Sequence, residues 1–329
     1  MRATVSAVKR RPSAAAEARR RVDRLRALRN SPDQLHEFAL EVLADEGNPD
    51  IIKLALESIG DRVRPSDGPV LRALYADFDE DGAKRDPGGT VRVEVLRSLW
   101  HLKSREDVEL ALHARDTVER TLQSNGEMIR AAGLALLGVL EPGRAALEAA
   151  LVLGRDDADI LRASSTVTGE PALTAVRLLA NLGETTALLL YALSGKAPTS
   201  EVVGEALRGI AGLDPNIIRP MLVSLVHQED DGLLMAVCDV LVEMAPDPEN
   251  AALVYQLLES PSRGEVYEFL VTSIVASRRQ DLIEMVLETL PREMSRKRLA
   301  AALEALRLAP RTPSVERAIA GLERRVARQ

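Results

Sequence analysis

The sequence repeats one kind of unit: an amphipathic segment that ends in a small or apolar residue, a short turn, and a second apolar segment. Within each segment, apolar residues recur at i, i+3, i+4 and i+7, the pattern of an α-helix too short to be stable alone. In the C-terminal half the first segments end 31 or 32 residues apart, at Leu182, Leu213, Met244, Ala276 and Leu308. Such helices must stack on neighbours to bury their apolar faces.

Composition and turn residues also favour helices. Aromatic residues make up only 2% of the chain, and Ala, Leu, Arg and Glu dominate, which excludes a large β-sheet. Asp214-Pro215 and Asp247-Pro248 are typical helix starts, with a capping carboxylate before a proline at the first turn. Gaps of two to five residues between helices require antiparallel neighbours. We therefore predict an all-α protein of about eight antiparallel helix pairs without a β-sheet.

Two segments resemble the inner helix of HEAT repeats, particularly the bacterial and phycobilin-lyase-like forms. They are Ile129-Arg130-Ala131-Ala132 with its continuation to Pro142, and Ala175-Val176-Arg177 with its continuation to Glu184. The resemblance covers about residues 48–327 and implies a right-handed α-solenoid whose inner helices line a concave face. It implies a single HEAT-like body over residues 31–329 and is nearly silent about function.

Charge is distributed unevenly along the chain, whose formal net charge is −7. Residues 1–30 hold ten Lys and Arg against two acids, and residues 292–329 hold ten against four. Residues 31–291 therefore hold 23 basic and 44 acidic residues. An acidic body repels phosphate, so a nucleic-acid groove along its whole length is not expected, whereas a basic end can still contact anions.

The basic segment 1–30 is predicted to be an N-terminal arm or a capping helix. A solvated extension, a docking element for nucleic acid or an anionic membrane surface, and an organellar transit peptide are the alternatives that its charge allows. The candidate anionic-contact residues are Arg19, Arg20, Arg21 and Arg24.

A row of arginines provides the first candidate partner site. Aligning the repeat ends places Arg97, Arg177, Arg208 and Asp239 at one equivalent position on successive inner helices, and Ala135 interrupts the row. These arginines either line a groove for an acidic or helical partner, or pair with carboxylates or carbonyls of adjacent repeats and fix the stacking. We favour the second interpretation, because surface ladders usually serve the scaffold.

Residues 75–90 form the longest stretch predicted to be non-helical, an acidic loop insertion. Its first half matches a calcium-binding loop through Asp77, Asp79, Asp81 and Gly82. Gly88 stands where that loop needs a bidentate Glu, so tight calcium binding is not expected, although a weak divalent site stays open. Trp100, which closes the next helix, is either a core residue or an interface anchor.

No catalytic, cofactor or metal site is predicted. The sequence holds one cysteine, Cys238, in an apolar context that favours a buried, inert thiol, and no helical zinc pair joins the dispersed histidines His36, His101, His113 and His227. Gly-rich phosphate-binding motifs and the G-x-S-x-G hydrolase motif are absent. No apolar run reaches the roughly 18 residues of a membrane span, so we expect a cytoplasmic protein.

The sequence thus favours a non-enzymatic scaffold or adaptor that binds another protein on a HEAT-like surface, with Arg97, Trp100, Arg177 and Arg208 as candidate contacts. One alternative is a HEAT-like enzyme of the bilin-lyase or DNA-glycosylase type. The single Trp and the acidic body argue against the glycosylase. The other alternative is a nucleic-acid or anionic-surface binder that acts through residues 1–30.

Overall fold

The computed structural model describes residues 14–119, 126–154, 169–194, 197, 199–260 and 263–328. Every regular element in these ranges is helical, and none of their residues belongs to a strand. The predicted all-α class is therefore confirmed for the described residues. Short helices with a strong apolar periodicity and few aromatic or β-branched runs account for this outcome.

The chain divides into two compact units, which we describe separately. Unit 1 comprises residues 1–145 and 157–166, and unit 2 comprises residues 146–156 and 167–329. The division falls inside the helix α9 (Pro142–Gly154). No sequence feature predicted this division. The single HEAT-like body over residues 31–329 stays a prediction.

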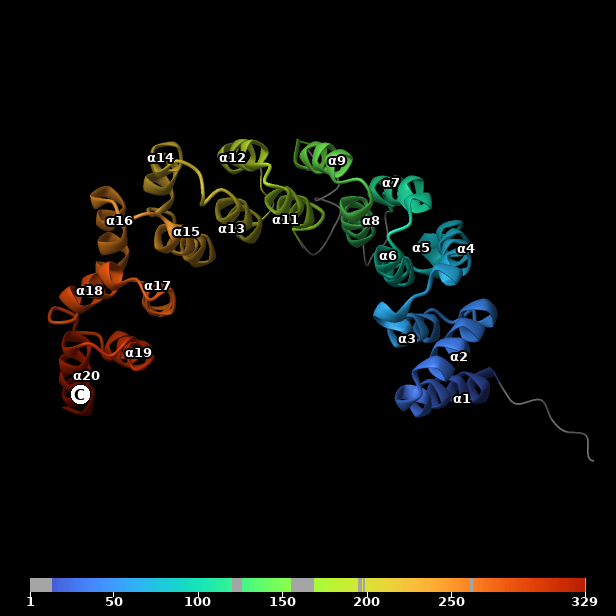
Figure 1. Cartoon of the computed structure of the whole chain (residues 1–329), viewed down its shortest axis with the longest axis horizontal. Coiled ribbons are helices and arrows are strands. Elements are labelled where there is room, and N and C mark those ends of the chain that lie inside the picture. Colours follow the sequence, from blue (N-terminus) through green and yellow to red (C-terminus); the bar gives the residue numbers. More distant parts are fainter. Residues whose placement is uncertain are drawn as a thin grey trace, which may run out of the picture. The chain divides into compact units, whose positions relative to one another are not determined.

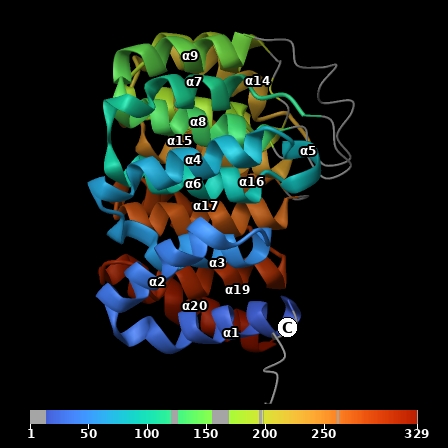
Figure 2. The ribbon, with the colours of Figure 1, turned by 90° about the vertical axis from the view of Figure 1, so that its right-hand side faces the viewer.

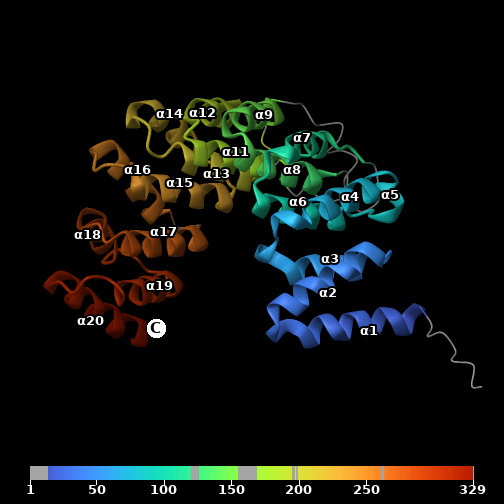
Figure 3. The same ribbon diagram turned by 45° about the vertical axis from the view of Figure 1, so that its right-hand side comes forward.

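Unit 1 packs helices that follow one another closely in the chain. They are α1 (Ala14–Ala27), α2 (Pro32–Asp45), α3 (Pro49–Ile59), α4 (Gly68–Asp79), α5 (Gly82–Arg85), α6 (Thr90–Leu102), α7 (Val108–Asp116) and α8 (Glu127–Leu140). Helix α3 contacts α1, α2 and α6, and α6 contacts α4 and α8. Figures 2 and 3 show these helices stacked side by side with their long axes roughly aligned.

Unit 2 arranges its helices in two rows. They are α11 (Ala172–Leu182), α12 (Thr185–Ser194), α13 (Ser200–Gly209), α14 (Pro215–Leu225), α15 (Asp231–Glu243), α16 (Pro248–Glu259), α17 (Gly264–Ser277), α18 (Gln280–Thr289), α19 (Arg296–Leu306) and α20 (Pro313–Arg328). The odd-numbered helices contact one another in chain order and form the first row. The even-numbered helices each contact a first-row helix and form the second row (Figure 1).

The predicted helix starts explain where several of these elements begin. The side chains of Asp214 and Asp247 accept hydrogen bonds from backbone N–H groups two residues later, and a proline follows each at the first turn. Thr199, Asp230 and Ser295 cap α13, α15 and α19 in the same way, accepting from the third residue beyond. The capping side chains therefore satisfy N–H groups that the helix itself leaves unpaired.

The prediction that residues 75–90 are non-helical is wrong over much of that range. Helix α4 continues to Asp79, and α5 forms a further short helix from Gly82 to Arg85. The helix continues because Leu74, Tyr75 and Phe78 extend the core face of α4 and are buried. The free energy gained by burying them outweighs the unfavourable effect of the acidic residues between them.

The basic N-terminal segment is helical and packed from Ala14 to Ala27. Helix α1 contacts α2 and α3, and Leu25 on it is fully buried. The capping-helix alternative therefore fits this part of the segment. Residues 28–30 of the predicted arm form a short 3₁₀ turn after α1, and residues 1–13 lie outside the described residues.

Candidate functional site

Arg177 and Arg208, two of the predicted partner-binding residues, belong to a series of ion pairs across the first row of unit 2. Arg177 on α11 donates through Nη2 to Oε1 of Glu205 on α13 at 3.2 Å. Arg208, one turn further along α13, donates through Nε to Oδ2 of Asp239 on α15 at 2.8 Å. Its Nη1 also lies 3.6 Å from Oε1 of Glu205. We call Arg177, Glu205, Arg208 and Asp239 the charge ladder.

The charge ladder alternates in sign, so its charges neutralise one another. The side chains of Arg177 and Arg208 are 50% and 40% exposed, and exposed pairs of this kind contribute only about 0.2–1 kcal/mol each. Each guanidinium faces a carboxylate of the next first-row helix. This is the interhelical pairing that we favoured from the sequence, and a partner-binding role for the two arginines stays a prediction.

Arg97 and Trp100 lie on α6, in unit 1, whereas the charge ladder lies in unit 2. Arg97 pairs with Glu94, one turn earlier on its own helix, and its side chain is 59% exposed. Trp100 is 38% exposed, with its ring edge-on to His101 and beside the ammonium of Lys103. Trp100 is thus half-buried and available at the surface, as an interface anchor requires, and its partner-binding role stays a prediction.

The four arginines proposed as anionic contacts lie on α1. Arg21 pairs with Glu46 at 3.0 Å, and the guanidinium of Arg24 stacks on the Phe38 ring at 4.1 Å. Arg20, Arg21 and Arg24 line a hollow of about 340 Å³ between α1 and α2, together with Glu17, Glu41 and Asp45. Acidic side chains therefore accompany the basic ones. Binding of an anion by Arg19, Arg20, Arg21 and Arg24 stays a prediction.

The acidic segment before α6 surrounds a buried arginine. Arg92 is fully buried and forms ion pairs with Asp79 at 3.3 Å, with Asp86 at 3.3 Å and with Glu119 at 2.5 Å. Asp86 also accepts hydrogen bonds from the backbone N–H groups of Val91 and Arg92. Burial lowers the pKa of the Arg92 guanidinium, but the hydrogen bonds and charges of Glu119 and Asp86 outweigh burial and raise it overall. The cluster joins α4, α6 and the segment after α7.

The carboxylates of the partial calcium motif all contact cationic or imidazole groups. Arg85 binds Asp77 at 2.6 Å and Lys84 approaches Asp81 at 3.2 Å, while Asp79 contacts Arg92 and His113. Across the described ranges, no three His, Cys, Asp or Glu side chains gather closely enough to hold a metal ion. The arrangement is therefore an ion-pair network between elements.

Cys238 lies at the centre of α15 and is fully buried, as predicted. Burial, with a smaller effect from the neighbouring Asp239, raises the pKa of its thiol to about 12. Because the thiolate is the nucleophile, the thiol is unreactive at neutral pH.

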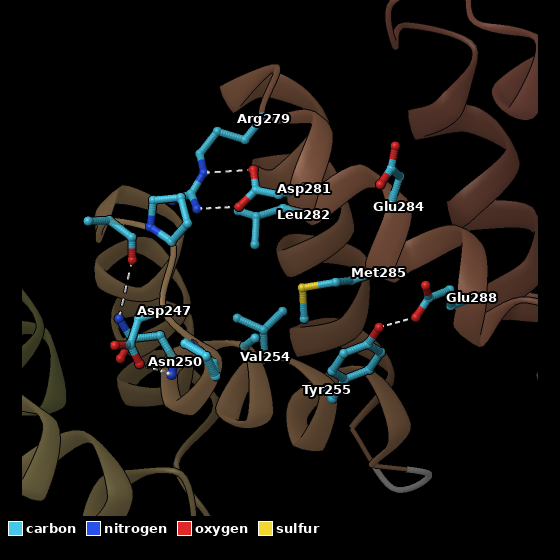
Figure 4. A pocket seen from close by; sticks show the side chains of 14 residues that line it. Asp247, Asn250, Val254, Tyr255, Arg279, Asp281, Leu282, Glu284, Met285 and Glu288 are labelled. Carbon is cyan, nitrogen blue, oxygen red and sulfur yellow. Dashed lines mark hydrogen bonds and ion pairs between the residues drawn. The ribbon is translucent and has the colours of Figure 1, made fainter.

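A further candidate site lies between α16 and α18 in the second row of unit 2 (Figure 4). We call it the α16–α18 pocket; its volume is about 460 Å³. Its floor is apolar: Val254 on α16 and Leu282 and Met285 on α18 are buried and face the space between the two helices. These positions follow the helical period and belong to the core face of each helix, and each of the three side chains is at most 8% exposed.

One end of the pocket is held by ion pairs and backbone contacts. Arg279 forms a two-pronged pair with Asp281, through hydrogen bonds of 3.2 and 2.6 Å, and donates to the carbonyl oxygens of Val242 and Met244. Its hydrogen bonds lower the pKa of the Asp281 carboxyl. Asp247 caps α16 and pairs with Arg219 at 3.1 Å. At this end, charges are compensated within the protein.

The other end of the pocket presents carboxylates without basic partners. Glu284 accepts a hydrogen bond from Gln280 at 3.0 Å, and Glu288 accepts one from the Tyr255 hydroxyl. This hydrogen bond, with burial and nearby negative charge, raises the pKa of Tyr255 above its ordinary value. Within the part of the chain that the structure describes, neither Glu284 nor Glu288 forms an ion pair with Lys, Arg or His.

Sequence reasoning did not identify this pocket. A signal was present in α18, where Asp281, Glu284 and Glu288 recur at helical spacing with no basic residue between them. Acids at i and i+4 on one face repel each other, which makes such a row unusual when no arginine separates its members. The apolar residues beside it were predicted only as core.

Comparisons with protein-family models, with curated proteins and with solved structures found no match to this chain. None of the helices in the described ranges combines the length and apolar content that crossing a membrane requires. The site must therefore be interpreted from its own chemistry.

Proposed function

We propose that this chain is a non-enzymatic scaffold or adaptor, an α-solenoid of the HEAT type, that binds a segment of another protein in the α16–α18 pocket. The observation that carries the proposal is the pocket itself: an apolar floor between two helices, bordered at one end by carboxylates that have no basic partner in the described chain. Protein-binding pockets combine apolar burial with a polar rim in this way.

The arrangement of helices supports the same proposal. In unit 2 the first-row helices contact one another in chain order, and the second-row helices follow them, as in a stack of helix pairs. Stacked pairs present long surfaces for partner proteins. The low cysteine content and the apolar runs shorter than a membrane span favour a cytoplasmic protein.

Site-specific photo-crosslinking in the cells that produce the protein tests this proposal. A photoreactive phenylalanine replaces Ala251, a half-buried residue that lines the pocket, in one variant and Glu268, exposed on α17 in the first row, in a control. We expect one protein adduct from position 251 that position 268 does not give. Equal adducts from both positions, or none from position 251, would refute a docking role for the pocket.

A further inference from the structure

The α16–α18 pocket has the chemistry to select its occupant by charge. We propose that it binds a basic peptide segment, with an arginine between Glu284, Glu288 and Tyr255 and an adjacent leucine-sized side chain on the apolar floor. This inference rests on the proposed function and specifies the partner. Four observations support it: the cavity, the carboxylates beside it that form no ion pair, the Tyr255 ring, and the basic hollow on the other side of α18.

The cavity sets the apolar part of the ligand. Its volume of about 460 Å³ lies over Val254, Leu282 and Met285, which offer aliphatic and thioether surface. A thioether side chain adapts to different apolar groups, which suits a site that receives side chains from another molecule.

The charge around the cavity sets the sign of the ligand. Four carboxylates and one guanidinium line the pocket, and Arg279 already binds Asp281. Asp247 is paired with Arg219, so the carboxylates of the pocket that lack an ion pair are Glu284 and Glu288. Arg292, whose charge reaches Tyr255, pairs with Glu259 at 3.4 Å. Such a rim attracts a cation and repels an acidic segment.

The positions of these groups favour arginine over lysine. Glu284 and Glu288 lie one turn apart on the same side of α18, so two carboxylates can accept from the several N–H groups of one guanidinium. Tyr255 is held beside them by its hydrogen bond to Glu288 and presents an aromatic ring on which a guanidinium can stack. An ammonium group has neither the fork nor the planar face.

The neighbouring groove confines a basic segment to this pocket. Between α18 and α20 a second hollow of about 440 Å³ is lined by Leu287, Leu290 and Leu322, with Arg317 and Arg325 among its polar residues. Its guanidinium groups repel cations. A basic segment should therefore meet α16 and the near side of α18, and the charge reversal across α18 limits it there.

The test uses the full chain and a fluorescein-labelled, alanine-based helical peptide of about 15 residues, with two arginines and one leucine on one face. Fluorescence anisotropy gives Kd, and the methyl resonance of Met285, assigned with Met285→Leu, reports whether the peptide occupies the pocket. We expect binding with a shift of that resonance. The Glu284→Lys/Glu288→Lys variant should raise Kd at least about tenfold, and the control Glu268→Lys should change it less than about twofold.

Two matched peptides complete the test: one with lysine for arginine, which should bind more weakly, and one with glutamate for arginine, which should not bind. The inference is overturned if the glutamate peptide binds equally well, if the double variant retains the affinity of the native chain, or if no peptide shifts the Met285 resonance. Photo-crosslinking at position 251 judges the docking role separately, because an adduct with a non-basic segment would overturn only the inference about charge.

Discussion

The charge ladder and the α16–α18 pocket lie on different rows of unit 2, and their carboxylates differ in whether they form ion pairs. In the ladder, Glu205 and Asp239 each meet an arginine of the same or a neighbouring first-row helix. In the pocket, Glu284 and Glu288 meet Gln280 and Tyr255 instead, and no cation of the described chain pairs with them. Carboxylates that already have counter-charges hold helices together, and carboxylates that lack them are available to another molecule.

Exposure and pairing together determine what a charge contributes to stability. The largest effect is therefore expected in the buried cluster around Arg92 in unit 1. Arg92→Met should lower the free energy of unfolding by about 3–5 kcal/mol, because it leaves Asp86 buried without its counter-charge. Denaturant unfolding followed by circular dichroism measures the change. The control Arg85→Ala breaks an exposed pair and should cost much less than Arg92→Met. Equal losses would contradict the argument.

A smaller loss is expected within the charge ladder. Arg208→Ala removes the contacts to both Glu205 and Asp239 and should lower the free energy of unfolding by about 1 kcal/mol, while peptide affinity stays unchanged. The control Arg97→Ala breaks a pair within one helix and should cost about 0.2–0.5 kcal/mol. Loss of partner affinity with unchanged stability would instead make the ladder a binding surface.

Neutralising a pocket carboxylate should raise the free energy of unfolding, whereas the substitutions above lower it. Glu284→Gln removes the repulsion between acids one turn apart on α18, so the free energy of unfolding should rise by about 0.2–0.5 kcal/mol. The matched change Glu205→Gln in the ladder should lower it, because Glu205 lies between two arginines. Parallel denaturation curves of the two variants compare the signs. A loss of stability in Glu284→Gln would show that this carboxylate serves the fold.

The smallest effect concerns pH at the compensated end of the pocket. Hydrogen bonds from Arg279 lower the pKa of Asp281 below its ordinary value of 3.8, so the folded state binds the Asp281 proton less tightly than the unfolded state. This contribution to stability is present above about pH 4 and is lost as the pH falls through the lowered pKa. Carboxyl NMR titration checks the pKa, which Arg279→Gln should return toward 3.8. An ordinary value in the native chain would contradict the pairing.

Much of the helical architecture was accessible from local sequence pattern. The apolar period and the capping residues Asp214 and Asp247 place their helices, because both are local signals that lie within the helix or directly before it. The alignment of Arg208 with Asp239 was also informative, since these side chains do meet across neighbouring helices. The end of α4 was missed because the acids of that segment suggested a loop, while burial of Tyr75 and Phe78 decides the structure.

The α16–α18 pocket was missed for a different reason. A helical period shows that Val254 and Met285 are apolar-face residues, but it does not show that two second-row helices leave a hollow between those faces. Glu205 was missed as well, because only the three-dimensional stacking reveals that it lies between Arg177 and Arg208. Pairing between helices depends on their relative rotation, which local pattern does not specify.

The contacts between successive helices of the first row affect how unit 2 unfolds and how its length can change in evolution. Each first-row helix contacts the helices immediately before and after it in the row, about one repeat away in the chain. We therefore expect local unfolding at one end of the unit. Helices α19 and α20 can unfold while α11 and α13 remain packed together. For the same reason, duplicating or deleting one 31- or 32-residue repeat would lengthen or shorten the stack while each remaining joint kept its geometry.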